Sequence, residues 1–444
     1  MIKKLFLLLL AFNCPVTYAQ TVKTDVLVIG GSPQGTAAAI QCARSKVKTI
    51  LAADDIKINS SNDMVILNAN RNIASGIWGE FRQRAQEYYK NKKEIDTAYN
   101  AALRFEPEAG VNILKNISDT VKNLSLYLNA TFTTIKKDDD RWEVNIMQNG
   151  KTVTVKARVV IDATENGDVA VKAGAKFNNE FDNYKNSDLT LYRTAIAAGE
   201  SVAGRKDSNT GITANYYPPY PAWYIPINAV LLKDADNLLV TEKALPREKS
   251  IQYLPMQLAL GQGTGAIAAY CAFYKTTSKN LKVRLIQGEL LDFKGYLIPF
   301  ADIPQKDHNW RAIQQVAATG LLKGFSKTTN NESQFVFMPD SVVETNAIKP
   351  VLAGLYARAF LWFNKEKTSE LFTVGNMLSF ISDYTLTDPG ILNKTIQKEW
   401  KTQYKFKLDF DLKRPVTRRE FAVLANKFLN PFARTVDLSG RAIN

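Results

Sequence analysis

The sequence predicts an α/β fold with a small helical domain at its C-terminal end. Three patterns lead to this class: an apolar run that enters a glycine turn and a helix near the N-terminus, an alternating stretch over residues 124–162, and amphipathic helical patterns after residue 298. Continuous apolar runs are typical of strands buried in a parallel sheet, whereas alternating runs indicate strands with one solvated face.

The first of these patterns is a strand, a turn and a helix followed by a second strand. "TDVLVIG" (24–30) and "VKTILAA" (47–53) are the apolar runs, and "QGTAAAIQCARS" between them is rich in helix formers. This β-turn-α-β unit of about thirty residues is the dinucleotide-binding unit, in which N–H groups at the helix start face a pyrophosphate. Gly30 is expected to make the turn and Gly35 to let the helix approach the strand, with Gly31 between them. Ser32 stands where the middle glycine of G-x-G-x-x-G is expected, and the stretch alone fits a purely structural turn equally well.

An acid at the end of the second strand would bind a ribose hydroxyl in such a unit. Ala53 holds that position, and Asp54 follows it. A shift of one residue would bring Asp54 to the ribose, which makes it the candidate, but a loop or helix-cap role for Asp54 and Asp55 is the slightly favoured interpretation.

The rest of the N-terminal part predicts further elements of the same fold. Residues 76–123 are mostly helical, and residues 124–162 form three strands with a type I′ turn at Asn149-Gly150. "DNLLVTEKA" predicts a short buried strand, and "LALGQGTGAIAAYCAFY" predicts a helix that starts at its glycines. Residues 178–235 are rich in Tyr, Pro and Asn and predict extended segments and loops.

The first nineteen residues predict a secretory signal peptide, with two lysines, an apolar run and a cleavage site after Ala19 of "TYA". We therefore expect an exported protein, periplasmic or extracellular in a bacterium, with no transmembrane segment once the leader is removed. Loss of Lys3 and Lys4 lowers the formal charge from +14 to +12, and this charge is interspersed with acids. No basic block with interleaved aromatics is present, so nucleic acid is not an expected partner.

Cysteine and histidine usage limits the possible chemistry. Cys42 and Cys271 remain in the mature chain and are expected to be buried small hydrophobes and not a disulfide. His308 is the single histidine, which excludes a multi-histidine metal site, and no metal is expected. His308 itself is expected to be a loop or packing residue, and a bound cofactor would then carry any redox chemistry.

Five segments in order resemble the secreted FAD-dependent oxidoreductases of the glutathione-reductase-type flavoprotein superfamily. They are "DVLVIGGSPQGTAAAI", "SGIWGEFR", "FEPEAG", "VVIDATENGDVAVKAGA" and "NLLVTEKA…PMQLALGQGTGAIAA", within residues 24–275. The resemblance implies an FAD-type Rossmann domain with a β-meander and an inserted substrate region, over residues 20–297. The implied meander covers about 124–162 and the implied substrate region about 178–235. The resemblance also implies non-covalent FAD held by Gly30, Gly31, Ser32, Gly35, Ala163, Thr164, Gly167, Asp168, Gly261, Gln262 and Gly265, the last three at a helix start facing the flavin end; Asp54 joins them through the ribose argument above.

The chain also departs from the family pattern. A glycine pair usually follows the second strand, and Ser61, Asn62 and Asp63 stand near that place here. The resemblance brings Arg71, Trp78 and Tyr224 into segments near the flavin, but it assigns no catalytic residue.

Residues 298–444 form a separate helical domain in this interpretation. "FADIP…HNWRAIQQVAATGLLKGF", "FMPD" and "VTRREFAVLANKFL" are similar to an interrupted S-layer-homology module, which implies contact with envelope polysaccharide. Thr417 and Glu420 have the spacing of a capping box before an apolar run.

The sequence therefore predicts an exported FAD-dependent oxidoreductase that acts on a small organic or carbohydrate-derived substrate. An alternative is a non-catalytic descendant of the same fold that binds glycan or envelope polymer through its C-terminal domain. A polysaccharide lyase or hydrolase is a third possibility, which would need paired acids in one cleft.

Overall fold

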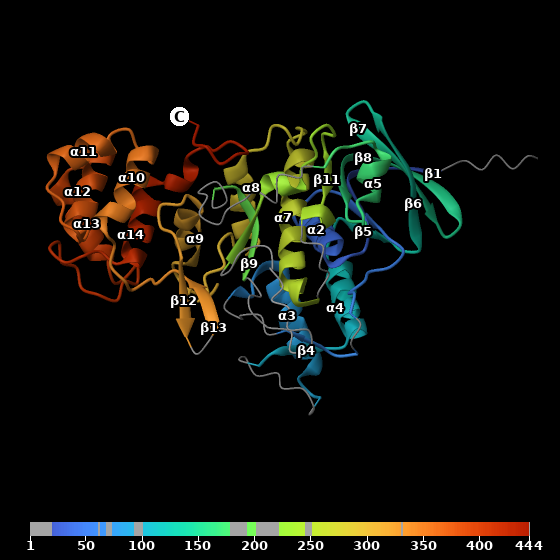
Figure 1. Ribbon diagram of the computed structural model, residues 1–444, viewed down its shortest axis with the longest axis horizontal. Helices are drawn as coiled ribbons and strands as arrows, with labels where there is room; N and C mark the ends of the chain where they lie inside the picture. The colour runs from blue at the N-terminus through green and yellow to red at the C-terminus, as the bar shows by residue number, and fades with distance from the viewer. Residues whose placement is uncertain are drawn as a thin grey trace, which may run out of the picture.

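The computed structural model describes residues 20–60, 63–67, 73–92, 101–177, 193–200, 222–244, 251–329 and 332–443. Figure 1 shows a sheet with helices packed beside it at one end of the molecule and a cluster of short helices at the other. The expected signal peptide, Ser61, Asn62, Arg71 and most of the expected substrate region lie outside the described residues.

A seven-stranded sheet forms the centre of the N-terminal part. Its strands follow the order β5-β2-β1-β8-β7-β6, and β11 also pairs with β8. The parallel members are β1 (Gln20–Ile29), β2 (Thr49–Ala52), β5 (Leu124–Tyr127), β8 (Lys151–Asp162) and β11 (Leu238–Val240). Val26, Leu27 and Val28 are fully buried, as expected of a central parallel strand covered on both faces.

The strand β8 changes partner along its length. Its first half pairs antiparallel with β7 (Arg141–Gln148), which pairs in turn with β6 (Ala130–Asp138). Its last residues pair with β11 instead, with Leu238 opposite Val160. Asn149 and Gly150 both have positive φ, of 48° and 74°, as the predicted type I′ turn requires. The stretch 124–162 therefore contains four strands and not three, because β5 joins the parallel sheet.

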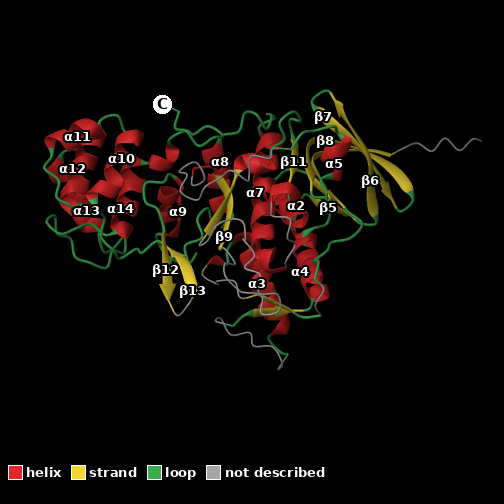
Figure 2. Ribbon diagram, in the orientation of Figure 1, coloured by secondary structure: helices red, strands yellow, loops and turns green. Residues whose placement is uncertain are grey.

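Four helices, red in Figure 2, build the layer beside this sheet. They are α2 (Pro33–Arg44), α3 (Gly76–Tyr89), α4 (Pro107–Asp119) and α7 (Leu254–Phe273). The helices α2, α4 and α7 pack against the strands of the sheet, and α3 packs against α4 and α7. The helix α7 begins at Leu254, so the expectation that it starts at Gly261 is wrong. Its glycines lie at mid-helix because they let it touch α2: a Cβ at Gly261 would be 2.2 Å from the Gln34 carbonyl oxygen, and one at Gly265 would be 2.5 Å from that of Ala38.

Shorter elements complete the N-terminal part. They are β3 (Val65–Leu67) paired with β4 (Leu103–Phe105), β9 (Ala195–Glu200) paired with β10 (Ala222–Pro226), α5 (Asp168–Lys172), α8 (Val283–Asp292), η3 (Ile227–Val230), η4 (Glu242–Ala244) and η5 (Ile251–Tyr253).

The C-terminal part is helical, as expected, with one unexpected hairpin. Its elements are α9 (Trp310–Ala318), β12 (Phe325–Thr329), β13 (Glu332–Val336), α10 (Thr345–Leu355), α11 (Ala359–Lys365), α12 (Val374–Thr385), α13 (Pro389–Glu399), α14 (Arg418–Leu424), η6 (Ala425–Leu429) and η7 (Pro431–Ala433).

Three segments of the C-terminal part form a closed ring of backbone hydrogen bonds. The N–H of Val343 donates to Val416 O (3.1 Å), that of Val416 to Phe372 O (2.8 Å) and that of Phe372 to Val343 O (2.9 Å). Each segment leads directly into a helix, α10, α12 or α14. The C-terminal part therefore contains three strand-and-helix segments that close on one another as a ring of three short strands.

The two parts share one apolar core. Tyr296, Leu297, Ile298 and Phe300 are all buried in the cluster that extends from β1 to α14. Leu297 N and Ile298 N both donate to Gln314 Oε1, at 2.8 and 2.9 Å. The expected boundary between residues 297 and 298 thus falls inside a buried and hydrogen-bonded run.

Two further expectations concern the cysteines and membrane-spanning helices. Cys42 and Cys271 are free and buried, which confirms that they act as small hydrophobes. Burial raises the pKa of Cys271 to about 12. Among the described helices, none has the length and apolar character needed to cross a membrane.

Candidate functional site

The turn between β1 and α2 has a backbone that only glycine can adopt. Gly30 has φ of +112°, and a Cβ there would be 2.3 Å from Ala163 O. A Cβ at Gly31 would be 2.0 Å from Asp55 O, and one at Gly35 would be 2.2 Å from Gly30 O. The three glycines therefore bring β1, β2, β8 and the start of α2 into direct backbone contact.

Ser32 is the N-cap of α2. Its φ of −62° and ψ of 164° are ordinary, and its Oγ accepts the N–H of Gly35 at 3.2 Å. Pro33 follows at the first helical position, where its missing N–H costs nothing. Serine replaces the middle glycine without backbone strain because this position needs no positive φ.

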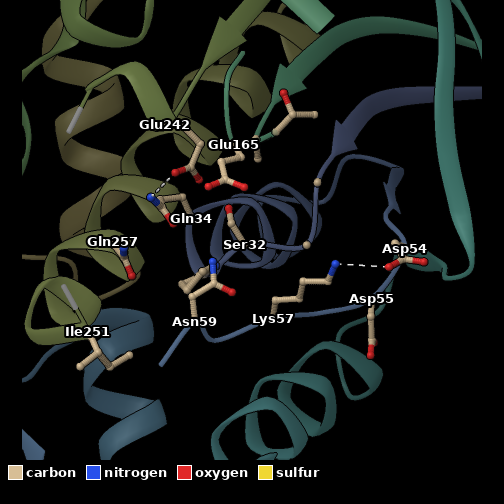
Figure 3. A pocket seen from close by; sticks show the side chains of 15 residues that line it. Ser32, Gln34, Asp54, Asp55, Lys57, Asn59, Glu165, Glu242, Ile251 and Gln257 are labelled. Atoms are coloured by element: carbon tan, nitrogen blue, oxygen red, sulfur yellow. Dashed lines mark hydrogen bonds and ion pairs between the residues drawn. The ribbon is translucent and has the colours of Figure 1, made fainter. Parts of the chain in front are cut away.

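A cavity of about 230 Å³ opens in front of this turn. Six of the predicted cofactor residues line it: Gly30, Gly31, Ser32, Asp54, Ala163 and Thr164. Figure 3 shows the start of α2, marked by Ser32, at its centre. The other lining residues are Pro33, Gln34, Asp55, Lys57, Asn59, Glu165, Glu242, Ile251 and Gln257.

On one side of the cavity, Asp54 follows β2 as predicted. Its carboxylate lies 3.2 Å from Lys57 Nζ, and its side chain is 74% exposed. Asp55 is turned away and accepts its neighbour's N–H, that of Ile56, at 2.8 Å. Asp54 can therefore reach a ligand hydroxyl at the cavity edge.

The opposite side carries three polar residues that the sequence interpretation did not single out. Gln34 Nε2 donates to Glu242 Oε2 at 3.1 Å, and Glu165 lies beside this pair in Figure 3. Gln34 is 1% exposed, and its fully buried Oε1 has no hydrogen-bond partner among the described residues. Gln34 and Glu242 therefore close this side of the cavity with a polar contact between α2 and η4.

The end of β8 is held by a buried carboxylate. Asp162 accepts Thr164 N (3.0 Å), Thr164 Oγ1 (2.6 Å) and Ala170 N (2.8 Å). Burial raises the pKa of Asp162, although these hydrogen bonds oppose the rise. Gly167 is the N-cap of α5 with φ of +73°, and Asp168 is an exposed residue whose N–H donates to Thr164 Oγ1 at 2.7 Å. Gly167 and Asp168 shape the loop and do not line the cavity.

Gly261, Gln262 and Gly265 also lie away from the cavity walls. Gln262 is buried and joins three elements: its Nε2 donates to Gln41 Oε1 (3.0 Å) and Phe293 O (3.2 Å), and its Oε1 accepts Ile77 N (3.2 Å). In the described structure these residues pack α7 against α2 and α3.

The remaining candidates are also apart from the cavity. Trp78 is 1% exposed in the core, and Tyr224 is buried with its ring centroid 6.3 Å from that of Phe335. His308 is an exposed loop residue whose Nε2 is 2.9 Å from Gln403 O, which confirms the predicted loop role. Among the described residues, no group of three or more His, Cys, Asp or Glu side chains is placed to hold a metal.

The cavity fits part of a dinucleotide cofactor. The glycine cradle and the start of α2 present backbone N–H groups, which suit a diphosphate, and Lys57 adds a positive charge. The cavity is smaller than the roughly 300–1,000 Å³ of whole small-molecule sites, so its walls would enclose only the middle of such a ligand. Its lining carries Asp54, Asp55, Glu165 and Glu242 against one lysine, an acidic balance that opposes a diphosphate.

Residues 25–190 match the family model described as FAD dependent oxidoreductase. This part of the chain, which contains the glycine turn and the meander, is thus similar to FAD-dependent oxidoreductases. No curated protein matches the chain. The comparisons give no support to an S-layer-homology module in residues 298–444.

Solved structures with similar regions share little sequence with the chain. The anhydrotetracycline hydroxylase OxyS from Streptomyces rimosus is 13% identical, with a TM-score of 0.28, over 35% of this chain and 35% of that one. The p-nitrophenol 4-monooxygenase PnpA from Pseudomonas putida DLL-E4 is 17% identical, with a TM-score of 0.27, over 36% and 45%. The chain thus spans less than half the length of either protein, and TM-scores below 0.5 indicate nothing about activity.

Proposed function

We propose that the protein is an exported FAD-dependent oxidoreductase, with non-covalent FAD and a small organic or carbohydrate-derived substrate. The observation that carries the proposal is the cavity at the start of α2, whose glycine turn lies within the segment that is similar to FAD-dependent oxidoreductases. The exported location rests on the leader pattern of residues 1–19.

The residues around the turn have distinct roles in holding FAD. The N–H groups of Gly31 and the first turn of α2 would face the diphosphate, and Lys57 would add charge attraction. Asp54, whose side chain is exposed at the cavity edge, would accept a ribose hydroxyl. FAD supplies hydride and electron transfer, which the side chains at this cavity do not offer by themselves.

The test is a visible absorption spectrum of the purified chain from residue 20, before and after incubation with FAD and desalting. We expect a flavin spectrum that survives desalting. A chain that stays colourless after incubation at high FAD concentration would remove the proposal. N-terminal sequencing of the chain recovered outside the cytoplasm tests export, with residue 20 as the expected first residue.

A second candidate function is glycan or envelope-polymer binding by the C-terminal part in a non-catalytic protein. Two observations favour it. The cavity lining has an acidic balance, and the apolar side chains of Phe360 and Leu361 on α11 and of Ile391 on α13 are 63–65% exposed. Sedimentation with purified envelope polysaccharide tests it, comparing the full chain with the variant Phe360→Ala/Leu361→Ala. Equal retention of both proteins would count against this candidate.

A further inference from the structure

Two arginines meet where the N-terminal part joins the C-terminal part. Arg193 precedes β9, and Arg284 lies on the first turn of α8. Arg193 donates to Thr319 O (3.1 Å) and Gly440 O (3.3 Å). Arg284 donates to Ala318 O (3.3 Å), Arg434 O (3.4 Å) and Arg193 O (3.4 Å). Figure 1 shows the chain end returning toward α8 at this junction.

Neither guanidinium has a carboxylate partner among the described residues. Besides the carbonyl oxygens, Arg284 contacts the side-chain oxygen of Gln287 (2.7 Å) and lies over the ring of Phe432 (5.0 Å). Two other partly buried arginines of this region do have acids: Arg414 pairs with Glu420 at 2.8 Å and Arg419 with Asp307 at 2.7 Å. Buried charges are normally paired, so two adjacent cations without an acid are unusual.

The end of α9 offsets this charge only in part. Ala318 is its last residue and Thr319 its C-cap, so both arginines face the negative end of the helix dipole. A helix C-terminus is equivalent to about half a negative charge. Two guanidiniums therefore retain more than one positive charge at this junction.

The protonation equilibria are consistent with this excess charge. Burial and the neighbouring Arg193 lower the pKa of Arg284 to about 9, and burial lowers the pKa of Arg193. An anion between the two side chains would relieve both effects.

Each arginine also keeps a donor group for a ligand. Within the described residues, Nη2 of Arg193 and Nη2 of Arg284 make no hydrogen bond, and neither is among the fully buried polar atoms. Both groups are therefore within reach of an ion from solvent, on side chains whose other donors are fixed.

We propose that Arg193 and Arg284 form an anion-binding site for one oxyanion group, a carboxylate, sulfate or phosphate, bound between the two guanidiniums. The ligand would fasten the chain end, through Arg434 and Gly440, to β9 and α8 of the N-terminal part. The site is separate from the cofactor cavity and does not depend on FAD binding.

The experiment is thermal unfolding of the full chain from residue 20 in sodium sulfate or sodium phosphate, with sodium chloride at equal ionic strength as reference. A ligand that binds the folded state alone raises Tm in a saturable way. We expect a saturable rise of about 2 °C or more over chloride, absent in Arg193→Gln. Sodium glucuronate provides a carboxylate arm that distinguishes a sugar acid from an inorganic anion.

Two variants keep the result interpretable. Arg311→Gln removes an exposed arginine of α9 that pairs with Asp292 and should keep the full anion response. If Arg193→Gln does not fold, Arg193→Lys takes its place. This variant retains the charge and should keep part of the anion response. Two results would overturn the proposal. One is an equal Tm in sulfate, phosphate, glucuronate and chloride; the other is a folded Arg193→Gln variant whose Tm rises with the anion as much as that of the wild type.

Discussion

At the scale of single residues, position 32 shows how a side chain can replace a glycine. The turn needs glycine at 30 because its φ is +112°, whereas position 32 has φ of −62° and accepts any small residue. Serine then gains a function that glycine lacks, because its Oγ caps the N–H of Gly35.

This predicts that Ser32→Ala destabilises the protein by about 1 kcal/mol, whereas Ser32→Gly costs a few tenths, since glycine is tolerated at an N-cap. Urea unfolding of both variants measures the difference. A Ser32→Ala variant as stable as the wild type would show that the cap contributes nothing.

A second residue-scale prediction concerns the ion pair between Asp307 and Arg419. Its bidentate contacts of 2.7 and 2.9 Å join the loop before α9 to α14, and both side chains are at most 15% exposed. We expect Asp307→Asn to lower the free energy of unfolding by about 2–3 kcal/mol, because Arg419 would stay buried without its acid. Asp340→Asn, which breaks an exposed pair with Lys407, is the matched control and should cost under about 1 kcal/mol.

The same pair gives a pH dependence with a definite sign. Burial would raise the pKa of Asp307, but hydrogen bonds from Arg419 and Asn309 outweigh it, and the pKa is lowered. The pair therefore stabilises the protein above the unfolded pKa of about 4, and the contribution is lost as pH falls through the folded pKa. The stability gap between the wild type and Asp307→Asn should narrow below pH 4; a constant gap from pH 7 to pH 3 would contradict this assignment.

At the scale of elements, the contact between α2 and α7 depends on glycines at mid-helix. Gly261 and Gly265 have no space for a Cβ, because the carbonyls of Gln34 and Ala38 lie 2.2 and 2.5 Å from that position. The start of α2, and with it the cofactor cavity, is positioned by this packing.

We expect Gly261→Ala to destabilise the protein by about 3 kcal/mol through overpacking. Gly288→Ala is the matched control, because Gly288 is also helical and a Cβ there meets nothing within 4 Å. This control should be neutral or stabilising by up to about 1 kcal/mol. Similar Tm values for the two variants would show that α2 and α7 can separate at little cost.

At the scale of the whole molecule, the two parts are not independent. The cluster of buried residues is continuous across residues 297 and 298, and Gln314 fixes this run from the C-terminal side. Asn228 also donates to Leu438 O at 2.8 Å, so the chain end returns to the N-terminal part.

Cutting the chain at the boundary expected from sequence should therefore expose core. We predict that the fragment 20–297 has a lower Tm than the full chain and binds more of a hydrophobic dye such as ANS. A fragment with the full chain's Tm and no added dye binding would show that the interface contributes little to folding.

Local rules predicted much of this fold. The β-turn-α-β unit, the Asn149-Gly150 turn and the Thr417–Glu420 capping box each depend on residues close in sequence, and all three are confirmed. The start of α7 was mistaken because glycines commonly mark helix ends, and only the neighbouring helix explains them at mid-helix. The threefold ring was missed because its segments share a backbone arrangement and little sequence.

The candidate site also has residues that local sequence patterns predicted and contacts that only the structure revealed. The sequence by itself determined the turn, Asp54 and the end of β8, because the ends of neighbouring parallel strands meet at one edge of a sheet. Only the tertiary structure decided that Gln34 meets Glu242, which lies 208 positions away, and that Arg193 meets Arg284. Such pairs depend on how whole elements pack, and a sequence pattern describes each element but not which distant side chains its packing brings together.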